Sequence, residues 1–312
     1  MVGLFIMMRE NYVGRFAPSP SGQLHFGSLV TAVASYLDAK HNKGKWLLRM
    51  EDIDEPRCIS GVDRDILHTL EQHGLCWDGE VIYQTQHHPR YQSIVDELID
   101  KQRAYLCTCT RKEIKAMGGQ YNGHCRVRTI PRQTPGSAVR LRLDEHLSPF
   151  DDLIMGKFEL HEANCIAEDV VLKRRDGLFS YNLVVVLDDV FQQVNHVIRG
   201  CDLIDVTPLQ RCVYKALGYE APTYGHVPVA SITPGRKLSK QNHAAPIDNK
   251  FAKDNLVKAM RFLGFDFPED NEFDSVASLL DSAISMWDRK KVLKTPEIIV
   301  PQHESTYYIQ PL

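Results

Sequence analysis

The first hundred residues alternate between short apolar runs and longer stretches in which apolar side chains recur every three or four positions. The runs at 12–16 and 45–50 predict strands, and between them residues 24–41 have helical spacing and good helix formers. Residues 63–73 and 91–101 have the pattern of amphipathic helices. Strand, helix and strand in this order are typical of the beginning of a parallel α/β sheet.

The pattern changes after residue 106. Residues 107–165 contain a cysteine cluster, a loop with two prolines and short alternating stretches such as 138–143, which together predict a mixed or β-rich insertion. The α/β pattern then returns, with strands predicted at 182–187 and 196–199 and a helix predicted at 208–217.

These elements predict an α/β protein built on a Rossmann-type parallel sheet. We expect its nucleotide-binding domain to consist of two halves, residues 1–106 and 166–245, separated by the insertion at 107–165. The mostly helical pattern that follows predicts a short helical C-terminal region at 246–312.

Composition and charge indicate which cellular compartment and which kinds of partner to expect. The formal net charge of −3 gives no overall basic character, which argues mildly against an RNA partner but leaves room for a local basic face. No apolar run has the length of a membrane span, and no signal-peptide pattern precedes the eight cysteines. We therefore expect a cytoplasmic monomer without membrane contact, in which clustered cysteines indicate a metal rather than a disulfide.

A turn-rich segment, residues 17–28, lies between the first predicted strand and the first predicted helix. Backbone amides and the positive end of a helix favour phosphate at such a place. Gly27 would let a nucleotide approach the backbone, His25 can donate to a phosphate oxygen, and Ser28 lies in the same turn. The alternative is an ordinary turn before a capped helix, with His25 a half-buried polar residue.

A second loop, residues 235–241, begins with a glycine and carries closely spaced cations, among them Lys237 and Lys240. Such a loop suits closure over a triphosphate and stabilisation of charge in the transition state. Taken alone, it is more often an ordinary solvated basic loop.

Together the two clusters resemble the "HIGH" and "KMSKS" signatures of class I aminoacyl-tRNA synthetases, although Ser28, Leu238 and Gln241 depart from them. Three longer segments are similar to glutamyl-tRNA synthetase in order and spacing: Arg15-Phe16-Ala17-Pro18-Ser19-Pro20-Ser21-Gly22, Arg49-Met50-Glu51-Asp52-Ile53-Asp54 and His196-Val197-Ile198-Arg199-Gly200-Cys201-Asp202. The resemblance covers residues 13–246, about three quarters of the chain. It implies an enzyme that activates L-glutamate with ATP.

The resemblance also implies roles for individual side chains. Arg15 and Tyr181 would hold the side-chain carboxylate of glutamate, Arg199 its α-carboxylate, and Glu51 with Ser19 its ammonium group. Any one of these arginines, or the glutamate, taken alone is more often part of a structural ion pair; the five matches together favour a glutamate site. We expect them at strand ends, where open α/β sheets bind their ligands.

The implied reaction is attack of the α-carboxylate on the α-phosphate of ATP. His25, Lys237 and Lys240 would be the catalytic residues and, with Gly27 and Ser28, would bind ATP together with Mg²⁺.

Cys107, Cys109 and Cys125 can supply most of a tetrahedral structural Zn²⁺ site, which requires a fourth ligand. Ligand chemistry favours His124, because imidazole is the commoner ligand. The resemblance favours Tyr121, since a branch of glutamyl-tRNA synthetase paralogues carries Cys, Cys, Tyr and Cys in this arrangement. Three buried free thiols are the remaining alternative.

About 70 residues follow Gln241, fewer than anticodon-reading helical domains need. The chain is in this respect similar to truncated paralogues that transfer glutamate to queuosine at the wobble position of tRNA(Asp). That acceptor comes from the resemblance alone. Two alternatives stay open here: a minimal synthetase that charges the tRNA 3′ end, and an inactive paralogue that only binds.

Overall fold

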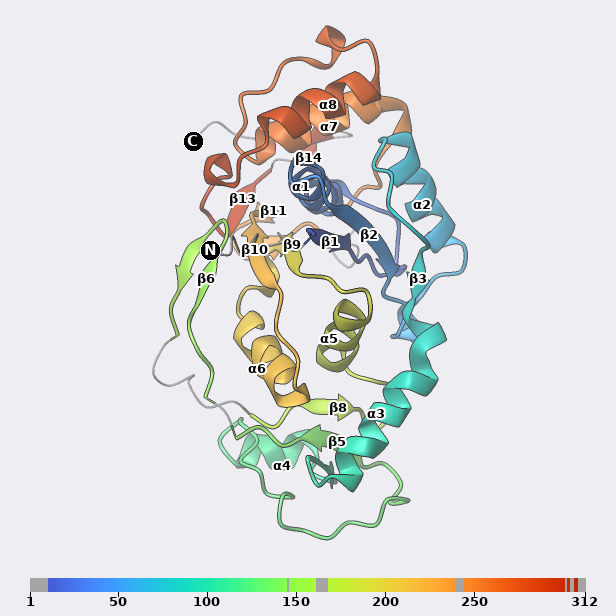
Figure 1. Ribbon diagram of the computed structural model, residues 1–312, viewed down its shortest axis with the longest axis vertical. Coiled ribbons are helices and arrows are strands. Elements are labelled where there is room, and N and C mark those ends of the chain that lie inside the picture. Colours follow the sequence, from blue (N-terminus) through green and yellow to red (C-terminus); the bar gives the residue numbers. More distant parts are fainter. Residues whose placement is uncertain are drawn as a thin grey trace, which may run out of the picture.

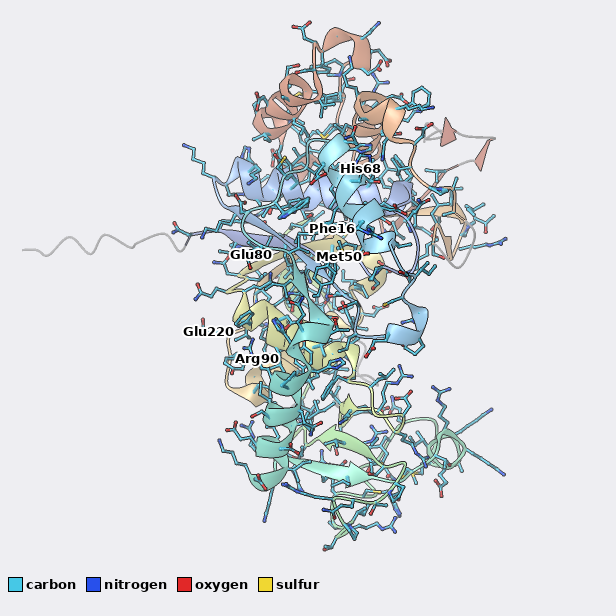
Figure 2. The ribbon with its side chains drawn as sticks, turned by 90° about the vertical axis from the view of Figure 1, so that its right-hand side faces the viewer. Phe16, Met50, His68, Glu80, Arg90 and Glu220 are labelled. Atoms are coloured by element: carbon cyan, nitrogen blue, oxygen red, sulfur yellow. The ribbon has the colours of Figure 1, made fainter. Side chains whose placement is uncertain are left out.

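The computed structural model describes residues 11–144, 146–160, 168–239 and 244–300, and the backbone of 302–303 and 306–307. At its centre, β1 (Val13–Phe16), β2 (Lys45–Met50) and β3 (Ile82–Tyr83) form a parallel sheet. The predicted strands at 12–16 and 45–50 are thereby confirmed. Figure 2 shows Phe16 and Met50, the last residues of β1 and β2, close together in the middle of the molecule.

The second half of the chain adds a parallel pair beside β1, consisting of β9 (His196–Gly200) and β10 (Thr223–Val227). Asn195 connects the two halves: its backbone amide donates to the carbonyl of Val13 at 3.0 Å, and its side-chain oxygen accepts from the amide of Val13 at 2.8 Å. Between β3 and β9 the chain forms other elements, which lie between the two groups of parallel strands in the sequence (Figure 1).

Helices cover these strands. The first is α1 (Phe26–His41), nearly all of whose apolar side chains are buried. The others in this part of the chain are α2 (Val62–Gln72), α3 (His88–Asp100) and α6 (Thr207–Leu217), and the short 3₁₀ turns are η1 (Glu55–Arg57), η2 (Gln84–His87) and η4 (Cys201–Leu203).

The strand predicted at 182–187 is wrong, because these residues form helix α5 (Tyr181–Phe191). A run of leucine and valine without polar interruption is compatible with a buried strand or a buried helix. Tertiary packing decides here, since α5 is enclosed between α3, α6 and β8 and buries apolar side chains on several faces. Ser180 begins the helix by accepting a hydrogen bond from the amide of Leu183.

The intervening segment is β-rich, as expected. An antiparallel sheet joins β4 (Ala104–Cys107), β5 (Ala138–Leu141) and β8 (Val171–Lys173), and an antiparallel pair joins β6 (Phe150–Asp152) and β7 (Gly156–Phe158). The sheet thus uses residues on both sides of 107–165. A short helix, α4 (Arg111–Ala116), lies beside it at one end of the molecule (Figure 1).

At the opposite pole, α7 (Ala252–Phe262) and α8 (Val276–Met286) pack on α1 (Figure 1). The strand β11 (Val229–Thr233) pairs with β12 (Arg236–Lys237) and with β13 (Glu297–Ile299). The remaining elements are η6 (Asn249–Phe251), η7 (Asp270–Glu272), η8 (Arg289–Lys291), β14 (Gln302–His303) and β15 (Thr306–Tyr307). Among the described helices, none is long and apolar enough to cross a membrane.

Candidate active site

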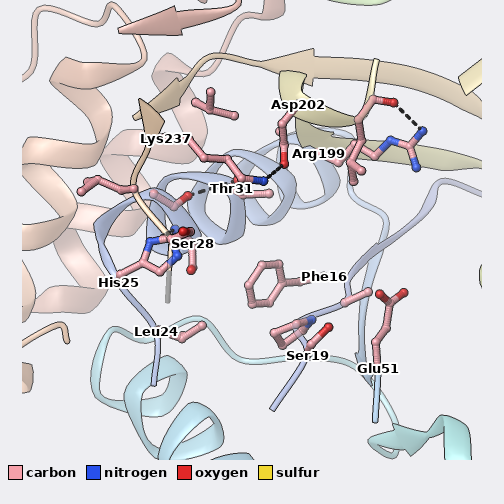
Figure 3. A pocket seen from close by; sticks show the side chains of 18 of the residues that line it. Phe16, Ser19, Leu24, His25, Ser28, Thr31, Glu51, Arg199, Asp202 and Lys237 are labelled. Atoms are coloured by element: carbon pink, nitrogen blue, oxygen red, sulfur yellow. Dashed lines mark hydrogen bonds and ion pairs between the residues drawn. The ribbon is translucent and has the colours of Figure 1, made fainter. Parts of the chain in front are cut away.

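A cavity of 410 Å³ opens at the carboxyl ends of β1, β2 and β9. The predicted glutamate- and ATP-binding residues that the structure describes all line it: Arg15, Ser19, His25, Gly27, Ser28, Glu51, Tyr181, Arg199 and Lys237. They come from segments up to about 220 positions apart, which the parallel strands bring to one edge of the sheet. Figure 3 shows His25 and Ser28 on one side of the cavity, with Ser19 and Glu51 together on another.

The first signature forms the amino end of α1. His25 is the N-cap residue, and its Nδ1 accepts a hydrogen bond from the amide of Ser28 at 3.2 Å. This bond leaves the proton of a neutral imidazole on Nε2. A Cβ atom at Gly27 would lie 3.3 Å from the ring of His25, tighter than ordinary contact, so a side chain there would press on the capping histidine.

The second signature begins at Lys237, the last residue of β12, which forms a hairpin with β11 whose turn contains Gly235 with φ 73°. Lys237 forms an ion pair with Asp202 across the cavity, and both side chains are partly exposed (Figure 3). Leu238 is buried and its amide donates to the carbonyl of Ala230, which fixes the hairpin to the core. Lys240, the other predicted catalytic lysine, lies outside the described residues.

A buried group of charges forms the floor of the cavity. Arg15 and Arg49 both reach Oδ1 of Asp189, at 3.3 and 2.8 Å, and Arg49 Nη2 also lies 3.5 Å from Glu51. Burial alone would raise the pKa of Asp189, but the two arginines hold it below its ordinary value. Asp189 therefore stays ionised and fixes both guanidinium groups.

For the pKa of Glu51, the effect of burial outweighs the effect of the neighbouring arginines. Burial raises the pKa of its carboxyl above the ordinary value, although Arg49 and Arg15 act to lower it. Tyr181, the first residue of α5, has its pKa raised mainly by burial and next by Glu51, so its hydroxyl remains a hydrogen-bond donor. An ammonium group bound beside Glu51 would further stabilise the ionised form of this carboxylate against the effect of burial.

Arg199 is 3% exposed and held on two sides. Its Nε donates to Nε2 of His226 at 3.1 Å, and its Nη2 donates to Oγ1 of Thr207 at 2.9 Å and to the carbonyl of Leu203. Among the described residues, none accepts a hydrogen bond from its buried Nη1. A guanidinium group with one buried donor left over on a cavity wall is suited to binding an anionic ligand.

The cysteines also come together. The Sγ atoms of Cys107, Cys109 and Cys125 lie within 4.8 Å of one another, which is the arrangement of a metal-binding group. The phenol oxygen of Tyr121 accepts from the amide of Cys125 at 2.9 Å and so lies beside the thiols, whereas His124 is exposed and outside the group. The cluster lies in the intervening segment, away from the cavity residues.

Sequence reasoning assigned no role to four residues that surround the site: Arg49, Asp189, Asp202 and His226. Arg49 and Asp202 stand inside the quoted motifs, next to residues that did receive roles. Asp189 follows the apolar run at 182–187, and His226 lies in a stretch for which no element was predicted, where an isolated charge or imidazole gives no local signal. Their importance follows only from the contacts of the folded chain.

The chain was compared with known proteins. The family described as tRNA synthetases class I (E and Q), catalytic domain, matches residues 12–292. A protein of Vibrio cholerae named glutamyl-Q tRNA(Asp) synthetase is 48% identical over 289 residues, 93% of each chain. One of the same name from Photobacterium profundum is 45% identical over 300 residues, 96% of each.

A solved glutamate-tRNA synthetase from Elizabethkingia anophelis superimposes with a TM-score of 0.75 at 26% identity, covering 92% of this chain and 67% of that one. The likeness in fold agrees with a parallel-strand core, a cavity at the strand ends and the two signatures that border it. The chain therefore belongs to the class I tRNA synthetases of the glutamate and glutamine type, and within them to the glutamyl-Q tRNA(Asp) synthetase family.

Proposed function

We propose that the protein activates L-glutamate with ATP and transfers the glutamyl group to queuosine at the wobble position of tRNA(Asp). The observation that supports the activation of glutamate is the set of charged groups that line the cavity. One wall presents Arg15, Arg199 and the carboxylate of Glu51, while the other presents the amino end of α1 and Lys237. Two cations and one anion match the two carboxylates and the ammonium of glutamate.

In the first step an oxygen of the α-carboxylate attacks the α-phosphorus of ATP, and pyrophosphate leaves to give glutamyl-adenylate. Arg15 with Tyr181 holds the side-chain carboxylate, Arg199 the α-carboxylate, and Glu51 with Ser19 the ammonium. His25, Gly27 and Ser28 bind the phosphates from the amino end of α1, and Lys237 and Lys240 stabilise the charge that develops there. Mg²⁺ accompanies the ATP of a class I synthetase and neutralises its phosphates.

In the second step a hydroxyl oxygen of the acceptor attacks the carbonyl carbon of the adenylate, and AMP leaves with the bonding electrons. The relatives' name supports queuosine in tRNA(Asp) as the acceptor. The charge distribution supports an RNA partner: residues 101–142 carry ten lysines and arginines against one glutamate, in a chain of net charge −3. Arg111, Lys112 and Lys115 on α4 are exposed among them and can contact backbone phosphates.

Two measurements test this function. Glutamate-dependent ATP–pyrophosphate exchange without tRNA tests the activation step, and its absence would contradict the proposal. For the transfer step, labelled glutamate and ATP are incubated with tRNA from a queuosine-replete strain and from a queuosine-deficient strain. We expect labelling only of the first tRNA; labelling of both would favour charging of the tRNA 3′ end, and no exchange and no labelling would favour an inactive binding paralogue.

We further propose that the cysteine cluster holds one structural Zn²⁺ through Cys107, Cys109, Tyr121 and Cys125. The position of the Tyr121 oxygen beside the thiols supports it over His124 as the fourth ligand. Metal analysis of Tyr121→Phe and His124→Ala proteins, purified without chelators, distinguishes the two. Full zinc content in Tyr121→Phe together with loss in His124→Ala would assign the ligand to His124 instead.

A further inference from the structure

A buried chain of hydrogen bonds leads from β6 to the cavity. Oδ2 of Asp152 lies 2.6 Å from Nδ1 of His226 on β10, and the Nε2 atom of the same ring lies 3.1 Å from Nε of Arg199 on β9. The side chains of Asp152 and His226 are both 0% exposed. The other oxygen of Asp152 accepts from the backbone amides of Ile154, Met155 and His226, so the carboxylate is held in one position.

The direction of each bond follows from the chemistry of the groups. A guanidinium group has donors only, so Nε2 of His226 must be the acceptor for Arg199 and carry no proton. The proton of the neutral ring is then on Nδ1 and is donated to Asp152, a carboxylate that only accepts. Asp152 thus sets the tautomer of His226, and the tautomer determines whether Arg199 has a partner for its Nε.

The hydrogen bonds of the other Arg199 nitrogens, together with the one from Nε, determine the orientation of its guanidinium group. With Nε held by His226 and Nη2 by Thr207 and Leu203, the guanidinium plane has one fixed orientation. This orientation leaves Nη1, the buried donor that lacks a partner among the described residues, as the group available for a ligand in the cavity.

We propose that Asp152 and His226 are positioning residues of the amino-acid site, which hold Arg199 in the orientation that binds a carboxylate of the substrate. The proposal rests on the proposed activation of glutamate and deepens it, because it adds a tautomer requirement to that site. Neither residue touches the cavity itself; both act through Arg199.

The surroundings of His226 favour the neutral ring that this role needs. Arg199, Asp152, Asp202 and Thr207 are the polar and charged groups around it, and Phe150 and Tyr224 pack against the ring. Burial lowers the pKa of His226, and Arg199 lowers it further, against the raising effect of Asp152. Burial alone would raise the pKa of Asp152, but His226 and the backbone amides of Met155 and Ile154 hold it below its ordinary value.

Asp152→Asn is the sharpest test. The asparagine keeps an oxygen for the three backbone amides but presents an NH₂ group to Nδ1, which drives the imidazole proton to Nε2 and sets it against the N–H of Arg199. Loss of one buried bond to a charged group corresponds to a rise of about 10- to 100-fold in the KM for glutamate in ATP–pyrophosphate exchange. We expect the KM for ATP and the kcat to stay within about threefold of the wild type, because the phosphate side of the cavity is unchanged.

Two further readouts separate positioning from general damage. In ¹⁵N-histidine NMR spectra, the ring of His226 should change from the Nδ1–H to the Nε2–H form in Asp152→Asn; an unchanged tautomer overturns the proposal. In a His226→Gln background the amide oxygen can accept from Arg199 and there is no tautomer to change. When Asp152→Asn is added to His226→Gln, it should therefore change the KM for glutamate by less than about threefold. A rise of about 10- to 100-fold in that background would also overturn the proposal.

Asp188→Asn is the matched control, because Asp188 is an equally buried carboxylate that accepts from a histidine, His87, at 2.9 Å, but makes no contact with Arg199. It should lower stability and leave the glutamate KM within about threefold. An equal rise in KM in this control would refute a specific role for Asp152. Absence of exchange in the wild-type protein would contradict the proposed function instead, while the NMR comparison would still decide whether Asp152 controls the ring.

Discussion

At the scale of single residues, the charged side chains at the floor of the cavity are destabilised by burial and stabilised by their oppositely charged neighbours. Removing arginine and aspartate side chains from water is costly, and the cost is recovered only where each charge has a close partner. Asp189 forms ion pairs with both Arg15 and Arg49, while Glu51 has one ion pair within the described part of the chain, with Arg49 at 3.5 Å. The site therefore carries these charges before a ligand binds. Among its members, Glu51 is the one whose ionised form is stabilised most by a bound ammonium group.

This imbalance predicts a pH dependence. Because burial raises the pKa of Glu51, its ionised fraction falls at a higher pH than that of an exposed glutamate, for which the pKa is about 4.3. The ammonium group of the substrate binds to the ionised form of Glu51. The kcat/KM for glutamate should therefore fall as the pH is lowered toward the raised pKa of Glu51. Glu51→Gln should reduce kcat/KM at neutral pH by more than about tenfold and remove the acidic limb of the profile. An acidic limb that persists unchanged in the variant would assign the titration to another group.

Lys237 offers a separate prediction about catalysis. Its ammonium group lies on the wall of the cavity beside the amino end of α1 and pairs with Asp202. We expect Lys237→Ala to slow adenylate formation by about 100-fold or more, the typical cost of removing one group that stabilises transition-state charge. Glutamate affinity, measured by calorimetry without ATP, should remain within about threefold. A variant with normal exchange would exclude the lysine from catalysis.

At the scale of elements, two helix beginnings define the site. α1 starts at its cap His25, so that Gly27 and Ser28 of its first turn line the cavity, and α5 starts at Ser180, which places Tyr181 on the cavity wall. A functional side chain at the first turn of a helix depends on the cap, because the cap fixes where the helix begins.

Ser180→Ala tests this dependence. The hydroxyl accepts from the amide of Leu183 at 3.4 Å, a long bond, so we expect a loss of about 0.5–1 kcal/mol in the free energy of unfolding. Urea denaturation measures this loss. If the cap also positions Tyr181, the KM for glutamate should rise about two- to fivefold, and Ser180→Thr, which keeps the hydroxyl, should restore both values. Equal effects of the two substitutions would show that the hydroxyl is not responsible.

At the scale of the whole molecule, one buried carboxylate connects the C-terminal region to the first helix. Asp38 on α1 is 0% exposed and accepts from Arg289 at 2.7 and 2.9 Å, from Trp287 at 2.9 Å and from the hydroxyl of Tyr12. These donors come from opposite ends of the sequence, so the carboxylate joins the residue before β1, helix α1 and the segment after α8.

Asp38→Ala would leave these donors without their common acceptor. We expect a loss of about 3 kcal/mol in the free energy of unfolding, in the range found when one partner of a buried pair is removed. Arg289→Met should cost less, because this arginine is partly exposed. Denaturant unfolding of both variants gives the values, and a loss below about 1 kcal/mol for Asp38→Ala would contradict this role of the carboxylate.

The extent of sequence prediction can be judged from particular elements. The strands at 12–16 and 45–50 and the helices at 24–41 and 208–217 were predictable because each has a clear period and definite breaks. The segment 182–187 was not, since a short uninterrupted apolar run fits a strand as well as a helix, and only its enclosure by α3, α6 and β8 decides. The candidate site residues were predicted from motifs, whereas Asp189, Asp152 and His226 were not.

The sequence by itself determined the α/β order of elements, the two signatures and the residue types that can bind ATP and a dicarboxylic amino acid, because these depend on local spacing and side-chain chemistry. The tertiary structure decided which of these side chains share a cavity and what holds them there. Asp152 and His226 are 74 positions apart, and Arg15 and Asp189 are 174 positions apart. Bonds between such residues form only when the parallel strands and the β-rich segment pack together, so no local pattern can specify them.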